Sequence, residues 1–195
     1  MANLTTLDDY KDAVGISNPK EDLKISALIP SVSQLVKTYC NSSFVDYFTT
    51  DKVETISLSY DTDIIQLSES PVVSITSVTE RATYGSAYKT LTPAAFQYFL
   101  DTDTDSLFRT TSGSKKNWPK GPGCVVVSYK AGYADVPADL KLAIYDLLTY
   151  YLKDEYKERK VMGGASIQNA SSTSQANNVA FPDHIKRVLD LYKNF

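Results

Sequence analysis

Only one histidine, His184, occurs among the 195 residues, and no other side chain titrates near neutral pH without help from its surroundings. A Ser-His-Asp or Cys-His arrangement would therefore depend entirely on His184, which stands at the start of the last predicted helix. A surface or capping histidine explains this position better than a catalytic base. The sequence also has no GxGxxG, GxxxxGKS or CxxC motif. We therefore expect no enzymatic activity and no cofactor.

The segment "DTDTDS" begins like a calcium-binding loop, with Asp101, Asp103 and Asp105 at its first, third and fifth positions. The sixth position carries Ser106 where such a loop needs glycine, and the twelfth carries Ser112 where it needs glutamate. We interpret the segment as an Asp/Thr-rich hairpin and predict no metal site. A small metal-dependent hydrolase that uses these three aspartates is the enzymatic alternative.

A short basic group surrounds the only tryptophan of the chain. Lys115, Lys116 and Lys120 flank Trp118, and Gly-Pro-Gly follows. An exposed tryptophan among lysines is typical of a partner-binding loop. In the other interpretation, the tryptophan packs on the sheet and the lysines are solvated. The sequence leaves both open.

The overall composition restricts the class of protein. The chain has 20 basic and 23 acidic residues, a net charge of −3, without the basic excess of a nucleic-acid-binding face. Cys40 and Cys124 lie in unrelated contexts, which favours two reduced, partly buried thiols over a disulfide. No apolar run approaches the ~20 residues of a membrane span, and "MANLTTLDDYKDAVGI" lacks the features of a secretory signal. We expect a soluble protein, cytoplasmic where it is made.

Helical patterns occupy both ends of the sequence. "TTLDDYKDAVGI" predicts a short helix ended by Gly15, and "SNPKEDLKISALIPSVSQLVKTYCNSSF" a second helix, kinked at Pro30. Pro137 to Lys160 predicts a long helix that ends before Gly163 and Gly164. The buried face of the second helix should include Leu28, Val32, Leu35, Val36 and Tyr39; the apolar stripe of the long helix contains Leu140, Ile144, Leu147 and Tyr151.

Between these helices, residues 52–130 alternate with a period of two and are rich in β-branched and aromatic residues. Five to seven short antiparallel strands are expected there. After the long helix, the small polar residues 163–180 predict a mobile tether. "FPDHIKRVLDLYKNF" then predicts a short amphipathic helix, marginal alone, that must dock on its own domain or on another chain. Its apolar face contains Ile185, Val188, Leu189 and Tyr192.

These patterns predict an α+β fold: a bundle of about four helices with an inserted antiparallel β subdomain and a mobile C-terminal arm. The expected boundaries are 1–50 with 132–162 for the helical core, 51–131 for the β subdomain, 163–180 for the tether and 181–195 for the docking helix.

Three segments resemble the head–tail connector (adaptor, or head-completion) proteins of tailed bacteriophages: "TTLDDYKDAVGI", "EDLKISALIPSVSQLVKTYCNSSF" and "YKAGYADVPADLKLAIYDLLTYYLKDEYKER". "SITSVTE" and the turn "GYADVPADLKLAI" are the most specific parts. The long Ser/Asn tether and the terminal Phe195 have no counterpart in the family pattern.

The resemblance implies a structural protein of the virion neck, present in the host cytoplasm during assembly. About twelve copies would form a ring under the portal, extend the DNA channel without sequence-specific DNA binding, and meet a stopper, nozzle or tail protein. The stripe on the long helix and the face of the terminal helix would then contact the portal or a neighbouring subunit. A carbohydrate- or receptor-binding module, using the tyrosine-rich β region, is the remaining alternative; the chain has 14 tyrosines.

Overall fold

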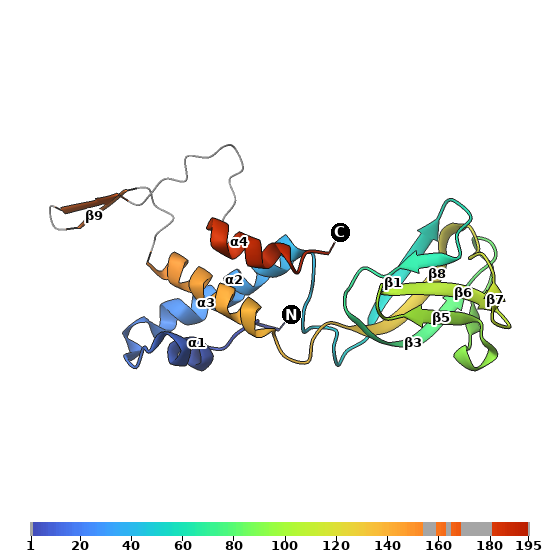
Figure 1. The fold of residues 1–195 in the computed structure, drawn as a ribbon, viewed down its shortest axis with the longest axis horizontal. Coiled ribbons are helices and arrows are strands. Elements are labelled where there is room, and N and C mark those ends of the chain that lie inside the picture. Colours follow the sequence, from blue (N-terminus) through green and yellow to red (C-terminus); the bar gives the residue numbers. More distant parts are fainter. Residues whose placement is uncertain (1, 154–158, 163–164, 169–180, 195) are drawn as a thin grey trace. The chain divides into compact units, whose positions relative to one another are not determined.

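The computed structural model describes residues 2–153, 159–162, 165–168 and 181–194. The chain divides into two compact units: a helical unit, Met1–Ser42 with Val136–Lys193, and a β unit, Ser43–Asp135 (Figure 1). The β unit is inserted in the sequence between two helical segments. The predicted α+β class, with helices around an inserted antiparallel β region, is confirmed.

The first two helices of the helical unit begin and end at residues suited to these positions. Helix α1 spans Leu7–Val14; the Thr6 hydroxyl accepts a hydrogen bond from the Asp9 N–H, and Gly15 ends the helix at φ 74°. A 3-10 turn, Pro19–Glu21, leads into α2, Asp22–Cys40, which contains Pro30. The buried face of α2 differs from the predicted one, since Leu28, Leu35 and Tyr39 are only half-buried. Its centre consists of Ile25, Ile29, Val32, Val36 and Cys40.

Helix α3 is shorter than predicted. It spans Ala138–Leu152, so the predicted end at Lys160 is wrong. Leu152, the last residue of α3, is also its last buried residue. Strand β9, Arg159–Met162, instead pairs antiparallel with β10, Ala165–Gln168. Ala165–Gln168, within the predicted tether 163–180, is thus a strand, and the rest of the tether lies outside the described residues.

The predicted terminal helix is confirmed as α4, Asp183–Asp190, which packs on α2 and α3. Of the two expected docking modes, the structure shows the one on its own unit. The Tyr39 hydroxyl of α2 donates to the Asp190 carboxylate at 2.6 Å, and the Tyr192 hydroxyl donates to Asp139 of α3, also at 2.6 Å. The Phe181 ring, just before α4, meets the Tyr39 ring edge-on at 4.9 Å.

The β unit contains two antiparallel sheets. The first has the order β1-β8-β3-β4, and the second has the order β2-β6-β5, with the two-residue β7 also paired to β6. The sequence predicted five to seven strands, and the structure has eight. The short strands β4 and β7 were not predicted, because so few residues show no clear alternation. The strands are β1 Lys52–Leu58, β2 Ile64–Gln66, β3 Val72–Glu80, β4 Lys89–Leu91, β5 Tyr98–Asp101, β6 Ser106–Thr111, β7 Ser114–Lys115 and β8 Gly121–Ala131.

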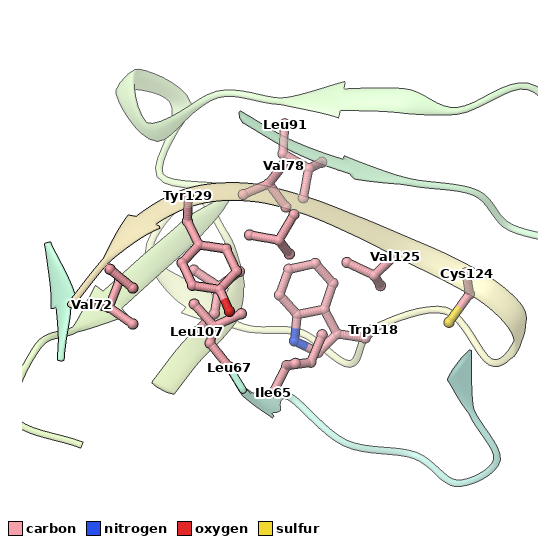
Figure 2. Close-up of a cluster of buried hydrophobic side chains, with 12 residues drawn as sticks. Ile65, Leu67, Val72, Val78, Leu91, Leu107, Trp118, Cys124, Val125 and Tyr129 are labelled. Carbon is pink, nitrogen blue, oxygen red and sulfur yellow. The ribbon is translucent and has the colours of Figure 1, made fainter. Parts of the chain in front are cut away.

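Both sheets contribute side chains to one apolar core (Figure 2). Trp118 lies inside it, only 2% exposed, and its indole Nε1–H donates to the Asp63 carbonyl at 3.0 Å. The interpretation in which the tryptophan packs on the sheet is therefore correct. The other buried residues are Ile65, Leu67, Val72, Val78, Leu91, Leu107, Cys124, Val125, Val127, Tyr129 and Ala131.

A buried ion pair connects the two sheets at one edge of this core. Arg109 of β6 donates two hydrogen bonds to the Glu80 carboxylate of β3, from Nη2 at 2.7 Å and from Nε at 2.8 Å. Its Nη1 donates to the carbonyls of Gln97 and Thr110, and the guanidinium lies 5.8 Å from the centre of the Trp118 indole. These contacts satisfy a buried charge that would otherwise be costly.

Candidate functional site

The side chains considered for catalysis have structural surroundings. His184 is exposed on α4. The segment 101–106 forms the turn between β5 and β6, in which the Asp101 carboxylate accepts hydrogen bonds from the Asp103 N–H and the Thr104 hydroxyl. Asp105 is buried and accepts from the Ser70 hydroxyl and the Val72 N–H. Within the described residues, no group of three or more His, Cys, Asp or Glu side chains is arranged to hold a metal ion.

The two cysteines are free, buried thiols, one in each unit, as the sequence predicted. Burial, and then the nearby Asp190 carboxylate, raise the pKa of the Cys40 thiol to about 12. A thiol with so high a pKa is protonated at neutral pH, so it is a poor nucleophile.

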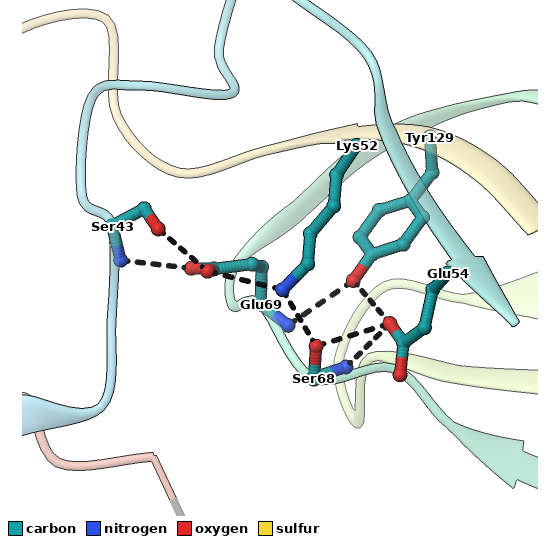
Figure 3. A network of polar contacts seen from close by, with 6 residues as sticks. All are labelled: Ser43, Lys52, Glu54, Ser68, Glu69 and Tyr129. Atoms are coloured by element: carbon teal, nitrogen blue, oxygen red, sulfur yellow. Dashed lines mark hydrogen bonds and ion pairs between the residues drawn. The ribbon is translucent and has the colours of Figure 1, made fainter. Parts of the chain in front are cut away.

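A polar network fixes the first residue of the β unit (Figure 3). The Ser43 N–H and hydroxyl both donate to the Glu69 carboxylate, at 3.0 and 2.7 Å, and Lys52 forms an ion pair with it at 3.2 Å. The Tyr129 hydroxyl donates to Glu54 at 2.8 Å and accepts from the Glu69 N–H. Burial, and then the hydrogen bond to Glu54, raise the pKa of Tyr129. The polar groups of this network bind one another, so we assign the network a structural role.

The segments that enter and leave the β unit are joined to each other. The Tyr133 N–H donates to the Phe44 carbonyl at 2.8 Å, and the Gly132 N–H donates to the Pro71 carbonyl at 2.8 Å. Gly132 has a φ of 94°, and a Cβ there would lie 1.8 Å from the Phe44 carbonyl oxygen. Only glycine permits this close approach.

The predicted basic loop is largely neutralised. Lys115 pairs with Asp63 at 3.1 Å and Lys120 pairs with Asp61 at 3.0 Å. Lys116 lies 4.0 Å from Glu80. The lysines are at the surface while Trp118 is not, so the structure does not bring the four residues together as one exposed site.

Most of the predicted contact residues on the helices form the core of the helical unit. Leu140, Ile144 and Leu147 are fully buried on α3, and Ile185 and Leu189 are buried on α4. The other three, Tyr151, Val188 and Tyr192, are half-buried at the edges of this core.

An apolar row on the outer face of the β2-β6-β5 sheet was not predicted from the sequence. The strand register places Ile64, Phe108 and Phe99 side by side on the three strands. The rings of Phe99 and Phe108 are 6.3 Å apart, and Phe99 is 60% exposed. The available signal was consecutive apolar residues, "II" and "YFL", which put apolar side chains on both faces of a strand. A contiguous exposed apolar face is typical of an interaction surface.

The helical unit also exposes large apolar side chains, namely Leu23, Leu142 and Leu191, each more than 60% exposed. None of the helices in the described part of the chain combines the length and apolar character needed to cross a bilayer.

Solved structures of phage-like particles contain chains with this fold. A chain in "Neck of native GTA particle computed with C12 symmetry" is 12% identical, with a TM-score of 0.58 over 100% of this chain and 94% of that one. A chain in "Virion of native gene transfer agent (GTA) particle" is 14% identical, with a TM-score of 0.59 over 98% and 90%. At this identity the likeness shows only a shared fold, one found in chains of gene transfer agent particles.

The family follows from the sequence comparisons. The family model described as "HCP: Head completion protein" matches residues 3–195, and the chain belongs to this family. The head completion protein of Escherichia phage T5 is 25% identical over 191 residues, 97% of this chain and 98% of that protein. The chain is thus a structural protein of the virion and not an enzyme, which confirms the resemblance and replaces the hydrolase and binding-module alternatives.

Proposed function

We propose that the chain completes the head by forming a symmetric ring in the virion neck, between the portal and the tail or the next neck protein. The observation that carries this proposal is the match of the head completion family to residues 3–195, nearly the whole chain. A chain of the same fold occurs in a particle neck with C12 symmetry, which supports a ring of about twelve copies.

The exposed apolar surfaces are suited to such a ring. Cyclic symmetry needs two different patches on each copy that fit one another. The β unit offers the row of Ile64, Phe108 and Phe99, and the helical unit offers Leu142 on α3 and Leu191 just after α4. Side chains this exposed in the single chain favour burial against a neighbour.

Burial limits which of the predicted contact residues on the helices can reach another protein. Leu140, Ile144, Leu147, Ile185 and Leu189 are occupied inside their own unit. We therefore assign contact with the portal or a neighbouring subunit to the half-buried residues at the edges of this core, Tyr151, Val188 and Tyr192.

A ring that extends the DNA channel must let the duplex slide. A strongly basic lining would hold DNA phosphates through counterion release. The net charge of −3 is compatible with passage of DNA without sequence-specific binding.

The test mixes the purified chain with isolated portal rings and examines the product by sedimentation and electron microscopy. We expect a monomer or small oligomer for the chain alone and closed rings on the portal in the mixture. A chain that stays separate from portal rings at micromolar concentration contradicts the proposal.

A further inference from the structure

A pocket with a cluster of positive charge lies in the β unit where β3 ends and β4 begins. It has a volume of about 400 Å³. Arg81, Lys89 and Lys116 supply three cations to its wall, and Glu80, Ser86 and Pro119 complete it. Of these three cations, only Lys116 was predicted from the sequence as part of an interaction loop.

Two of the three cations of this pocket have no ion-pair partner within the described part of the chain. Arg81 and Lys89 form no ion pair there, and Lys116 is 4.0 Å from Glu80. The Glu80 carboxylate already accepts two hydrogen bonds from the buried Arg109. Neighbouring Lys115 and Lys120, by contrast, each have an aspartate partner. The pocket therefore concentrates free positive charge on a protein whose net charge is −3.

Arg81 is held in place before any ligand arrives. Its guanidinium lies 4.9 Å from the centres of both the Tyr84 and the Tyr88 rings. Its Nη2 donates to the Pro122 carbonyl at 2.7 Å, while its buried Nε has no hydrogen-bond partner in the described residues. A Cβ at position 123 would lie 3.0 Å from Nη2, so glycine makes room for the guanidinium. A guanidinium fixed in this way binds an anion with little further loss of entropy.

The loop beside the pocket provides an ordered aromatic surface. The Ser86 hydroxyl donates to the Thr83 carbonyl at 2.7 Å and closes the turn that carries Tyr84. Tyr84 is 77% exposed although one face of its ring is beside Arg81. Its outer face is available to a planar or apolar group next to the anion.

We propose that this pocket binds a carboxylate side chain from an acidic segment of another neck protein, with an adjacent aromatic or apolar residue on Tyr84. The carboxylate would accept hydrogen bonds from Arg81 and be attracted by Lys89 and Lys116. The identification of the partner as a neck protein rests on the proposed function; the recognition of an acidic peptide does not.

The concave shape of the pocket favours a peptide over DNA. A duplex presents its phosphates on a convex surface, and a nucleic-acid-binding face needs a stripe of cations along it. Here Arg81, Lys89 and Lys116 line one concavity, and the flanking lysines are paired.

The test is an NMR titration of the full-length ¹⁵N-labelled chain with the capped peptide Tyr-Glu-Glu-Tyr at roughly millimolar concentrations. The matched control peptide has Gln in place of both Glu. We expect shifts confined to the amides of residues 80–89 and 116–123, with the Glu peptide only. K89Q should weaken binding by about fivefold, and R81Q with K89Q should weaken it further.

Lys120→Gln is the control variant, because that lysine is exposed and already paired with Asp61. It should leave binding unchanged. Because Arg81 also packs on two tyrosines, K89Q is the decisive variant: Lys89 is exposed, so its replacement should preserve the fold. Equal shifts with the Gln peptide, no shifts with either peptide, or tighter binding of a 12-base-pair duplex to the same amides would each overturn the proposal. This titration does not measure ring assembly. A failure of the chain to form rings on the portal would therefore contradict the proposed function without affecting the peptide-binding result.

Discussion

At the scale of single residues, the β unit depends on one buried charge pair. Arg109 is 2% exposed, and the Glu80 carboxylate accepts from two of its nitrogens. Replacing both charges with apolar groups can be neutral, whereas removing one partner leaves the other buried and unpaired. The effect of a single substitution is therefore large even where the net contribution of the pair is small.

We predict that Arg109→Met destabilises the β unit by about 3–5 kcal/mol, because Glu80 then loses its buried partner. Urea unfolding monitored by the fluorescence of Trp118, the only tryptophan, measures the change. The matched control is Lys120→Gln, whose exposed pair with Asp61 should contribute less than about 1 kcal/mol. Equal effects of the two substitutions would contradict the prediction.

At the scale of elements, the terminal helix shows how an amphipathic pattern can identify a face without identifying its partner. The spacing of Ile185, Val188, Leu189 and Tyr192 predicted the helix, yet the structure buries two of these residues against α2 and α3. The hydrogen bonds from Tyr39 to Asp190 and from Tyr192 to Asp139 connect α4 to each of those helices. The helix is therefore part of the bundle.

We predict that Leu189→Ala lowers the stability of the helical unit by about 2–5 kcal/mol, the usual cost of a cavity at a fully buried leucine. Leu191→Ala is the control: it lies two residues away, is 78% exposed, and should change stability by less than about 0.5 kcal/mol. Thermal unfolding monitored by far-UV circular dichroism measures both. If Leu189→Ala behaves like its control, α4 is held by something other than its own unit.

Elements with local signals were predictable from the sequence, and those that depend on distant partners were not. Gly15 marked the end of α1 correctly, and the period-two pattern identified the β region. The end of α3 was missed because a helix-compatible, mostly charged sequence continues past Leu152. The row of Ile64, Phe108 and Phe99 could not be seen because strand register joins three separate segments. For the same reason, the cations at positions 81, 89 and 116 were not recognised as one pocket.

At the scale of the whole molecule, the chain has two separately built cores. The core around Trp118 and Tyr129 consists of residues of the β unit alone. The core of α2, α3 and α4 consists of residues from before and after the insertion, such as Val36, Ile144 and Leu189. Each unit is of a size that can unfold cooperatively by itself. The insertion thus adds a compact β unit to the chain without interrupting either core.

We predict that calorimetry of the full-length chain resolves two unfolding transitions, one for each core. Arg109→Met should lower only the transition of the β unit, and Leu189→Ala only that of the helical unit. A loss of 1 kcal/mol shifts the midpoint of a domain of this size by about 4–8 °C, so losses of several kcal/mol are easily resolved. The loss of Trp118 fluorescence identifies the β transition, and the loss of helical circular dichroism identifies the other. The control for irreversible unfolding is the wild-type chain scanned at two heating rates. A single transition whose midpoint both substitutions lower equally would mean that the two units unfold as one.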